Sequence, residues 1–468
     1  MKNCIKVLVF AVAVMFVLAA CGGGTPAAPP AQETPAAAAE TPADAPAGGG
    51  GGSGTIAGLA DEDEVEFLEG DGDITLRLTW LSGGGLNRDG IRDGLRPFIE
   101  ETGIGVDIIY VTGDWAEYFT KIQLMIAAGE VIDLANVAIE GFEMLVQLGL
   151  AIPVDDWIGR NQAEWDAVAN DISPAVMDVM NFGGQQFGLP KEWNNVVTHI
   201  NTAMLEEAGL DMPPPNWDRA TFLNYAQAMT RTREDGTRQF GVHVPNAYFM
   251  FQGWLFNNGT TYMSADFTES NLLDPRVVEM FQFMYDLIYV YEVAPIPVTG
   301  VSATHLLIQG DVGMHFAGRW PTNQYFEAGF NDVAIQYVPQ MSPGYSEVVW
   351  GGTGVFTLRT SEHPEEATRL AVHLSSPQFI EGFMGAGAIP VLNSVAERLV
   401  PALGVPQNYN LFITSAAQAR PVQSPAQYAE VANLIHMAMS DILVSRRDVE
   451  TVLQETDAQL NMILFDNR

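Results

Sequence analysis

Few side chains in this sequence have the type and spacing that catalysis requires. The 468 residues include two cysteines, Cys4 and Cys21, and seven histidines that stand apart from one another. The patterns of a hydrolase serine (GxSxG), a phosphate-binding loop (GxxxxGK[ST]) and a zinc peptidase (HExxH) are absent. A pair of carboxylates across a cleft could hydrolyse a glycosidic bond, and a sequence alone does not exclude such a pair. Because none of these catalytic motifs occurs, we expect a binding protein rather than an enzyme, with no metal ion or other cofactor.

The first 20 residues have the composition of a secretory signal peptide. Lys2 and Lys6 precede an apolar run from Val7 to Ala20, which at 14 residues is shorter than the roughly 20 that span a bilayer as a helix. The tetrapeptide LAAC that ends at position 21 resembles the lipobox of bacterial lipoproteins. That resemblance implies cleavage before Cys21 and acylation of its thiol. The mature protein would then be anchored by lipid to the extracytoplasmic face of the cell membrane.

The segment after the cysteine has the composition of a linker. Residues 21–60 are rich in Pro, Ala, Thr and Gly and contain almost no large apolar side chain. A segment that cannot bury apolar surface does not offset the entropy lost on folding. We expect residues 21–60 to form a disordered tether that holds a folded body away from the membrane.

The charge of the chain limits the classes of ligand that it can bind, and its cysteine content limits the disulfides that it can form. The chain has 57 Asp and Glu against 22 Lys and Arg, a formal net charge of −35. Such a surface argues against nucleic acid and against polyanionic ligands. After cleavage only the cysteine used for lipid remains, so no disulfide is expected and the core must be stable without one.

The alternation of strand and helix patterns predicts an α/β architecture. Residues 74–80 and 106–111 read as strands, and VIDLANVA at 131–138 reads as a third. Between the last two, DWAEYFTKIQLMIAAGE places Phe119, Ile122 and Met125 on one helical face. Further on, Asp274 and Pro275 have the types of an N-cap and first-turn residue for a long helix. Strands that alternate with helices favour largely parallel sheets.

Five segments, in order, resemble the extracellular solute-binding proteins of carbohydrate ABC transporters, the maltose- and glycerol-phosphate-binding type. The segments are residues 118–158, 183–222, 307–320 (LIQGDVGMHFAGRW), 348–395 and 449–464 (VETVLQETDAQLNMIL). Two departures occur: Ile132 stands where the family commonly has proline, and His199-Ile200-Asn201 where it commonly has Tyr-Tyr-Asn. The resemblance is taken to cover nearly all of the chain from about residue 73 to the end.

This resemblance implies a two-lobed periplasmic-binding-protein-like fold (type II) with hinge crossovers. Lobe I would comprise residues 73–189 plus 351–400, and lobe II residues 190–350 plus 401–468. The crossings would fall near Pro190 and Gly351, where proline and glycine can set or release backbone angles. A monomer is expected.

The resemblance also implies a function. A membrane-tethered protein of this family captures a sugar or oligosaccharide in the cleft between its lobes and delivers it to the permease subunits of an ABC importer. Two alternatives use the same fold: a ligand-binding sensor or receptor lipoprotein, and a binder of a non-sugar solute such as a glycerol phosphodiester, a polyamine or a peptide. The sequence does not specify which sugar.

A neutral sugar dictates which residues its site needs. Aromatic rings suit the C–H faces of the sugar, and amide or carboxylate groups suit its hydroxyl edge. Such side chains belong on loops at the carboxyl ends of strands. Trp80, at the end of the first strand, is one candidate, and the glycine pair Gly351 and Gly352 is expected as a close-approach turn. By resemblance, further ligand-binding candidates are Glu140, Trp193, Asn194, Tyr248, Trp320 and Tyr428.

Several neighbours of these candidates receive weaker or different predictions. Glu192 would face the cleft by resemblance, but Trp193 and Asn194 are favoured over it. Trp254 and Asn257 fit either the site or the core. Trp115 and Tyr118 are expected to pack on a helix face, and Arg319 is expected to be solvated.

Overall fold

The computed structural model describes residues 63–82, 86–383 and 387–467. The predicted signal peptide, the lipidation site Cys21 and the tether over residues 21–60 lie outside these residues. Within the described part of the chain, no helix has both the length and the apolar composition needed to cross a membrane.

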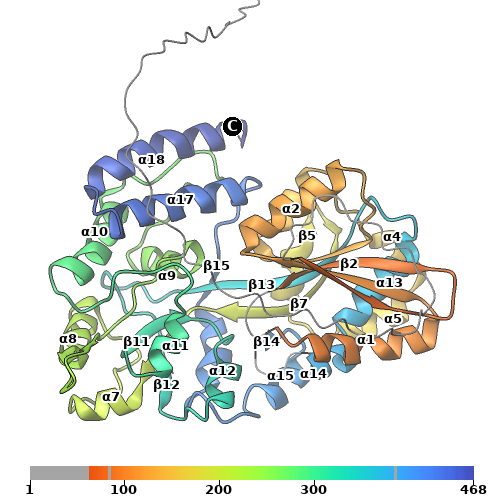
Figure 1. The fold of residues 1–468 in the computed structure, drawn as a ribbon. Helices are drawn as coiled ribbons and strands as arrows, with labels where there is room; N and C mark the ends of the chain where they lie inside the picture. Colours follow the sequence, from red (N-terminus) through yellow and green to blue (C-terminus); the bar gives the residue numbers. More distant parts are fainter. Residues whose placement is uncertain (1–62, 83–85, 384–386, 468) are drawn as a thin grey trace, which may run out of the picture. The chain divides into compact units, whose positions relative to one another are not determined.

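The larger sheet carries most of the strands and has mixed direction (Figure 1). Its order is β1-β3-β2-β4-β13-β7-β14, with β15 paired to β13. These strands are β1 (Glu64–Leu68), β2 (Thr75–Ser82), β3 (Gly105–Thr112), β4 (Leu134–Ala138), β7 (Gly188–Asn195), β13 (Val348–Thr357), β14 (Ile389–Pro390) and β15 (Ala419–Pro421). The three predicted strands are confirmed as β2, β3 and β4, and they pair in parallel. The expectation of largely parallel sheets is wrong, because β13 runs antiparallel to both β4 and β7.

A second, smaller sheet has three strands. β8 (Val197–Asn201) lies between β11 (Met314–Ala317) and β12 (Val333–Gln336) and is antiparallel to both. All residues of these strands are buried, so the sheet is covered on both faces. Two short hairpin pairs complete the strands: β5 (Asn181–Phe182) with β6 (Gln185–Gln186), and β9 (Arg231–Thr232) with β10 (Arg238–Gln239).

Several helices begin at a side-chain cap. The side chain of Asp274 accepts the backbone N–H of Arg276, and Pro275 occupies the first turn. This confirms the predicted start of α10. Asp114 and Glu117 form a capping box at the start of α2. The helices are α1 (Arg88–Thr102), α2 (Trp115–Ala127), α3 (Phe142–Gln147), α4 (Asp155–Arg160), α5 (Gln162–Ala169), α6 (Pro174–Met177), α7 (Thr202–Glu207), α8 (Arg219–Met229), α9 (Tyr248–Asn257), α10 (Pro275–Tyr289), α11 (Ala303–Ile308), α12 (Thr322–Glu327), α13 (Pro364–Leu374), α14 (Pro377–Phe383), α15 (Asn393–Leu399), α16 (Asn410–Thr414), α17 (Tyr428–Leu443) and α18 (Val449–Ile463).

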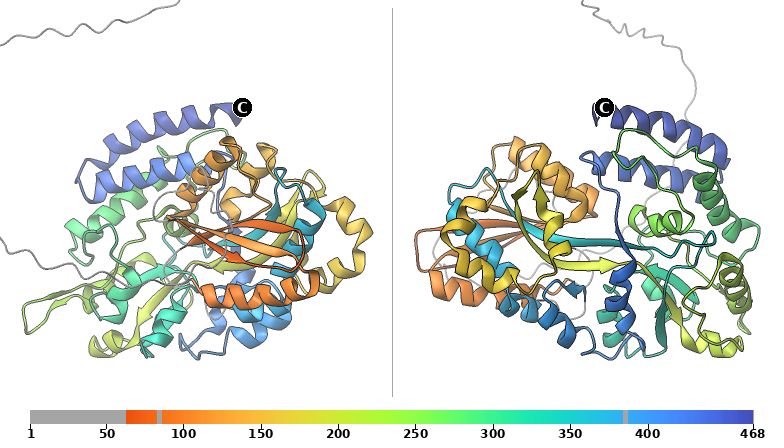
Figure 2. Two further views of the ribbon diagram at one scale, coloured as in Figure 1. Left: turned by 45° about the vertical axis from the view of Figure 1, so that its right-hand side comes forward. Right: turned by 180° about the vertical axis from the view of Figure 1, so that it is seen from behind.

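The chain passes from one sheet to the other along β7. This strand ends at Asn195 in the larger sheet, and β8 of the smaller sheet begins two residues later. β13 lies beside β7, with Gly351 opposite Asn194 and a shift in register between Thr353 and Gly354 (Figure 1). Helices α17 and α18 lie side by side, with α10 next to them (Figure 2). The bounds of the two lobes stay a prediction.

Two of the weaker candidates for ligand binding lie in the core. Trp254 and Asn257, on α9, are both completely buried. Trp254 packs edge-on against Phe222 and Phe316, and Asn257 holds the backbone carbonyl of Glu347 at 2.7 Å from its side-chain nitrogen. Both residues therefore support the fold.

Candidate functional site

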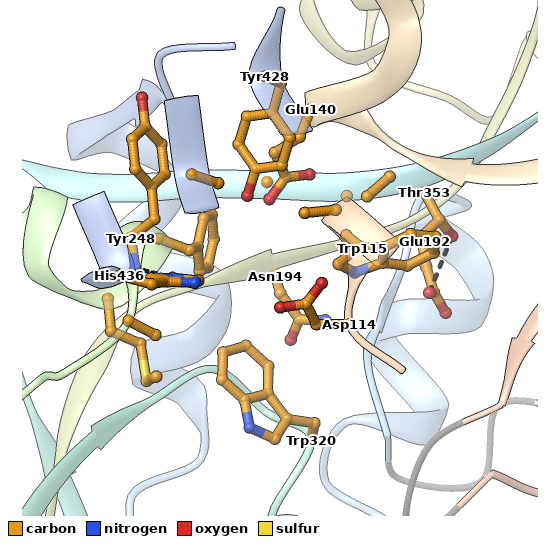
Figure 3. Close-up of a pocket in the computed structure, with 18 of the residues that line it drawn as sticks. Asp114, Trp115, Glu140, Glu192, Asn194, Tyr248, Trp320, Thr353, Tyr428 and His436 are labelled. Carbon is orange, nitrogen blue, oxygen red and sulfur yellow. Dashed lines mark hydrogen bonds between the residues drawn. The ribbon is translucent and has the colours of Figure 1, made fainter. Parts of the chain in front are cut away.

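A cavity of about 400 Å³ collects side chains from the larger sheet, from helices α2, α9 and α17, and from the loop that follows β11. Its lining has an aromatic part and a polar part (Figure 3). The aromatic residues are Trp115, Tyr248, Phe249, Trp320 and Tyr428. The polar residues are Asp114, Glu140, Glu192, Asn194, Thr353 and His436, and the backbone of Gly351, Gly352 and Gly387 completes the wall. Most of the predicted ligand-binding residues are therefore brought together.

Glu140 is the most unusual group in this lining. It follows β4, in the short turn Ile139–Gly141, and only 5% of the residue is exposed. Its own backbone N–H is the only hydrogen-bonding group that affects its carboxylate among the described residues. Burial, the larger influence, raises the pKa of Glu140 to about 7. A buried carboxylate without a cationic partner or a side-chain donor is destabilising, and such groups concentrate at functional sites.

Two tyrosines flank Glu140. Tyr248 begins α9, stacks on Tyr262 with ring centroids 4.5 Å apart, and donates its hydroxyl to the carbonyl of Gln423 at 2.8 Å. Tyr428 begins α17 and meets Tyr248 edge-on at 5.4 Å. Its phenol lies beside the Glu140 carboxylate in Figure 3. Burial raises the pKa of both phenols far above the ordinary value, with the Glu140 charge as the next cause, so both remain protonated donors.

His436 lies two helical turns beyond Tyr428 on α17. Its Nε2 accepts the backbone N–H of Tyr248 at 3.0 Å, so the ring proton is on Nδ1. Burial lowers the pKa of His436, and the nearby Asp114 partly opposes this. The imidazole is thus neutral at physiological pH and joins α9 to α17 at the wall of the cavity.

Trp320 is the most exposed large aromatic ring in the lining. It follows β11, is 37% exposed, and lies with its ring centroid 6.4 Å from that of Phe249. The loop that carries it is fixed from two sides: Asn194 Oδ1 accepts the N–H of Arg319 at 2.9 Å, and His199 Nε2 bonds the carbonyl of Gly318 at 2.9 Å. A fixed loop presents the indole face to the cavity at little entropic cost on binding.

Arg319 corrects a prediction from the sequence. It is completely buried rather than solvated, and its guanidinium donates to the backbone carbonyls of Ala388 and Leu399. Burial lowers its pKa to about 10, so it keeps its charge. Its role is to bind the Trp320 loop to the segment that carries β14 and α15.

Replacing Arg319 by methionine should lower the free energy of unfolding by about 2 kcal/mol. Two carbonyls would lose hydrogen bonds from a charged donor, at roughly 1 kcal/mol or more each. Urea denaturation measures the change. Arg398→Met is the matched control, because its pairing with Glu381 lies at the surface and such pairs contribute little. Equal effects from the two variants would contradict this role for Arg319.

The glycine pair allows β13 to approach its neighbours closely. A Cβ on Gly352 would lie 2.4 Å from the carbonyl oxygen of Glu192, and one on Gly351 would lie 2.7 Å from the Phe249 ring. Beside them, Thr353 donates its hydroxyl to Glu192 Oε1 at 2.8 Å (Figure 3). The other oxygen of Glu192 lies 3.3 Å from the buried ammonium of Lys191. Unlike Glu140, Glu192 therefore has a cationic partner.

A second cavity of about 200 Å³ adjoins the first. The two share Trp115, Glu192, Trp320, Thr353 and Gly387. Trp80 lines only this second cavity and is 2% exposed, with the Lys191 ammonium 4.7 Å from its ring centroid. Trp193 is also buried and lines neither cavity.

Some lining residues were missed or assigned differently from the sequence. Trp115 was expected only to pack on a helix face; it does stack on Phe119, yet it lines both cavities. Tyr118 does pack as expected, bonded to the carbonyl of Asn136 at 2.8 Å. Asp114 could have been found, because it follows the carboxyl end of a predicted strand. His436 could also have been found, because its spacing of eight from Tyr428 places the two on one helix face.

The described residues contain no group of three or more His, Cys, Asp or Glu side chains placed to hold a metal ion. The carboxylates of the cavity are instead arranged around aromatic rings. Such a lining suits an organic ligand with polar groups at its edge and C–H groups on its faces.

Solved structures share the fold of the described chain. An ABC substrate-binding protein from Listeria monocytogenes in complex with cycloalternan is 19% identical, with a TM-score of 0.75, over 84% of this chain and 99% of that one. Maltose-bound MalE3 of T. maritima is 18% identical, with a TM-score of 0.71, over 83% and 100%. These likenesses confirm the predicted two-lobed periplasmic-binding-protein fold.

Sequence comparison finds a relative and a family for this chain. An arabinooligosaccharide-binding protein of Halalkalibacterium halodurans is 25% identical over 252 residues, which cover 50% of this chain and 52% of that protein. The chain thus matches about half the length of this curated relative. The family described as bacterial extracellular solute-binding protein matches residues 95–408. The chain belongs to the bacterial extracellular solute-binding protein family.

Proposed function

We propose that this protein captures a sugar or oligosaccharide in the cavity around Glu140 and Trp320 and delivers it to the permease of an ABC importer. It would act outside the cell membrane as a lipid-anchored monomer, attached through Cys21. Ligand capture would involve no chemical change in the sugar.

The composition of the cavity is the observation that carries this proposal. Aromatic rings and a buried carboxylate that has neither a cation nor a side-chain donor face the same space. A sugar would place its C–H faces on Trp320 and Tyr428 and donate hydroxyl hydrogens to Glu140. Asn194 Nδ2 would serve as a donor to the ligand, because its Oδ1 is occupied by Arg319. We also propose ligand contacts for Tyr248 and for the backbone of Gly351 and Gly352.

The comparisons support the same reading. The relative from Halalkalibacterium halodurans is an arabinooligosaccharide-binding protein, and the structures with the same fold hold cycloalternan or maltose. Ligand contacts from the larger sheet and from the loop that follows β11 would favour a closed form of the protein, because binding drives closure only through higher affinity for that form.

The adjoining cavity would take a further part of an oligosaccharide. Trp115 and Trp320 line both cavities, so a ring held between them would connect the two spaces. Trp80 would contact ligand only in the second cavity. Trp193 is no longer a favoured contact, because it lines neither space.

A carbohydrate panel in a thermal-shift assay tests this function. A sugar at 100 times its Kd should raise the free energy of unfolding by about 2.7 kcal/mol and increase Tm measurably. The recovered sugar should be chemically unchanged after long incubation. A protein that responds to no mono- or oligosaccharide, but responds to a peptide or a glycerol phosphodiester, would contradict the proposal.

A further inference from the structure

The charges around the two cavities are strongly unbalanced. Three carboxylates line them, from Asp114, Glu140 and Glu192. Among the described residues, no lysine or arginine side chain lines either space. The remaining titratable base, His436, is neutral because its Nε2 accepts a backbone N–H.

The three carboxylates differ in how their charge is compensated. Glu192 has the Lys191 ammonium at 3.3 Å and the Thr353 hydroxyl at 2.8 Å. Asp114 caps α2 and accepts the N–H of Glu117 at 2.9 Å, so it has a helix dipole but no cation. Glu140 has neither a cation nor a side-chain donor, although it is nine-tenths buried.

Asp114 and Glu140 act on the same space. Both carboxylates raise the pKa of the Tyr428 phenol, after the larger effect of its burial. Figure 3 shows the Asp114 carboxylate in the middle of the cavity, between Trp320 and the Glu140–Tyr428 pair. Asp114, together with Glu140 in its ionised form, therefore gives a ligand on the Trp320 ring a negative potential that no described cationic side chain in the lining offsets.

We propose that the preferred ligand is a sugar that carries a protonated amine, with its ammonium group held between Glu140 and Asp114. This inference rests on the proposed sugar-binding function and specifies the substrate class. An ammonium supplies the positive charge that these carboxylates lack. The faces of Trp320 and Tyr428 add cation–π attraction at a water-poor site. An uncharged hydroxyl can donate to Glu140 but leaves its charge uncompensated, and a sugar acid is repelled.

Matched sugars that differ only in the substituent at carbon 2 of each ring test this charge preference. Isothermal titration would compare glucose with glucosamine, mannose with mannosamine, and cellobiose with the fully deacetylated chitosan disaccharide. The N-acetylated form of each amine keeps the nitrogen and removes the charge. In the pairs that bind, we expect the amine to bind at least 10-fold more tightly than its hydroxyl partner at low salt. This advantage should shrink severalfold in 0.5 M NaCl because salt screens the attraction.

Two variants locate the effect. Glu140→Gln should reduce the preference for the amine to about threefold or less. Glu143→Gln removes a nearby charge on α3 that lines neither cavity and is bonded to Gln147 at 2.7 Å. It should keep the preference.

The outcomes separate this inference from the function on which it rests. If hydroxyl or N-acetyl sugars bind as tightly as the amines, or if only longer neutral oligosaccharides bind, the charge preference is wrong and the sugar-binding function stands. If a linear polyamine binds more tightly than every amino sugar, the sugar part of the inference is wrong. If no carbohydrate of any kind binds, both proposals fail.

Discussion

Replacing Trp320 by alanine should weaken sugar binding about 100-fold, or about 2.7 kcal/mol, while the free protein stays folded. The indole lines both cavities and is 37% exposed, so a ligand would bury the remaining surface of the ring. Its loop is fixed by Asn194 and His199, which the substitution does not touch. Stability of the free protein should fall by no more than about 1 kcal/mol.

Titration calorimetry with the tightest sugar of the panel measures this loss. Phe326→Ala is the matched control, because Phe326 is 56% exposed on α12 and lines neither cavity. It should leave the Kd within a factor of two. Equal affinity of the Trp320 variant and the wild type would place the sugar outside the proposed site.

Replacing Glu140 by glutamine should stabilise the free protein at alkaline pH, by up to about 3 kcal/mol. The pKa of Glu140 is raised from its ordinary 4.5 to about 7 in the folded protein. The stability that its proton contributes is therefore fully present below pH 4.5 and is lost as the pH rises to about 7. Above that pH the folded protein contains a buried, uncompensated charge, and glutamine removes it while keeping the shape.

Urea denaturation at pH 4 and pH 8 checks this sign. The two proteins should have nearly equal stability at pH 4, and the variant should be more stable at pH 8. Glu397→Gln, at an exposed position on α15, is the control and should show no such divergence. The same Glu140 variant should bind sugar less tightly, because glutamine is a weaker acceptor for the hydroxyl hydrogens of the ligand than a carboxylate. This combination is expected of a residue that is kept for ligand binding at a cost in stability. A variant less stable than the wild type at pH 8 would contradict the account of Glu140.

Local signals in the sequence predicted the elements that stand next to the site. The Asp274–Pro275 pair marks the start of α10, and the alternation at 74–80 marks β2. These features depend on neighbours within a few residues, so a sequence carries them directly. The direction of β13 does not, because its partners β4 and β7 lie more than 150 residues earlier in the chain.

The same distinction between local and long-range information applies to the residues of the site. Trp80 was correctly placed in a strand near a chain turn, but its ring packs against Phe379 and Phe383 of α14, about 300 residues away. Arg319 is buried because carbonyls at positions 388 and 399 accept its hydrogen bonds. No pattern around either residue reports such distant partners. Trp320, Tyr248 and Tyr428 were placed by resemblance to a family, which carries information about long-range contacts that spacing alone lacks.

A crystal structure of the protein with its tightest-binding sugar tests the proposed binding site most directly. We expect a sugar ring in van der Waals contact with Trp320, with a polar group of the ligand within hydrogen-bond distance of the Glu140 carboxylate. A sugar bound at another surface, or bound in this cavity without touching either side chain, would contradict the binding roles proposed for Trp320 and Glu140.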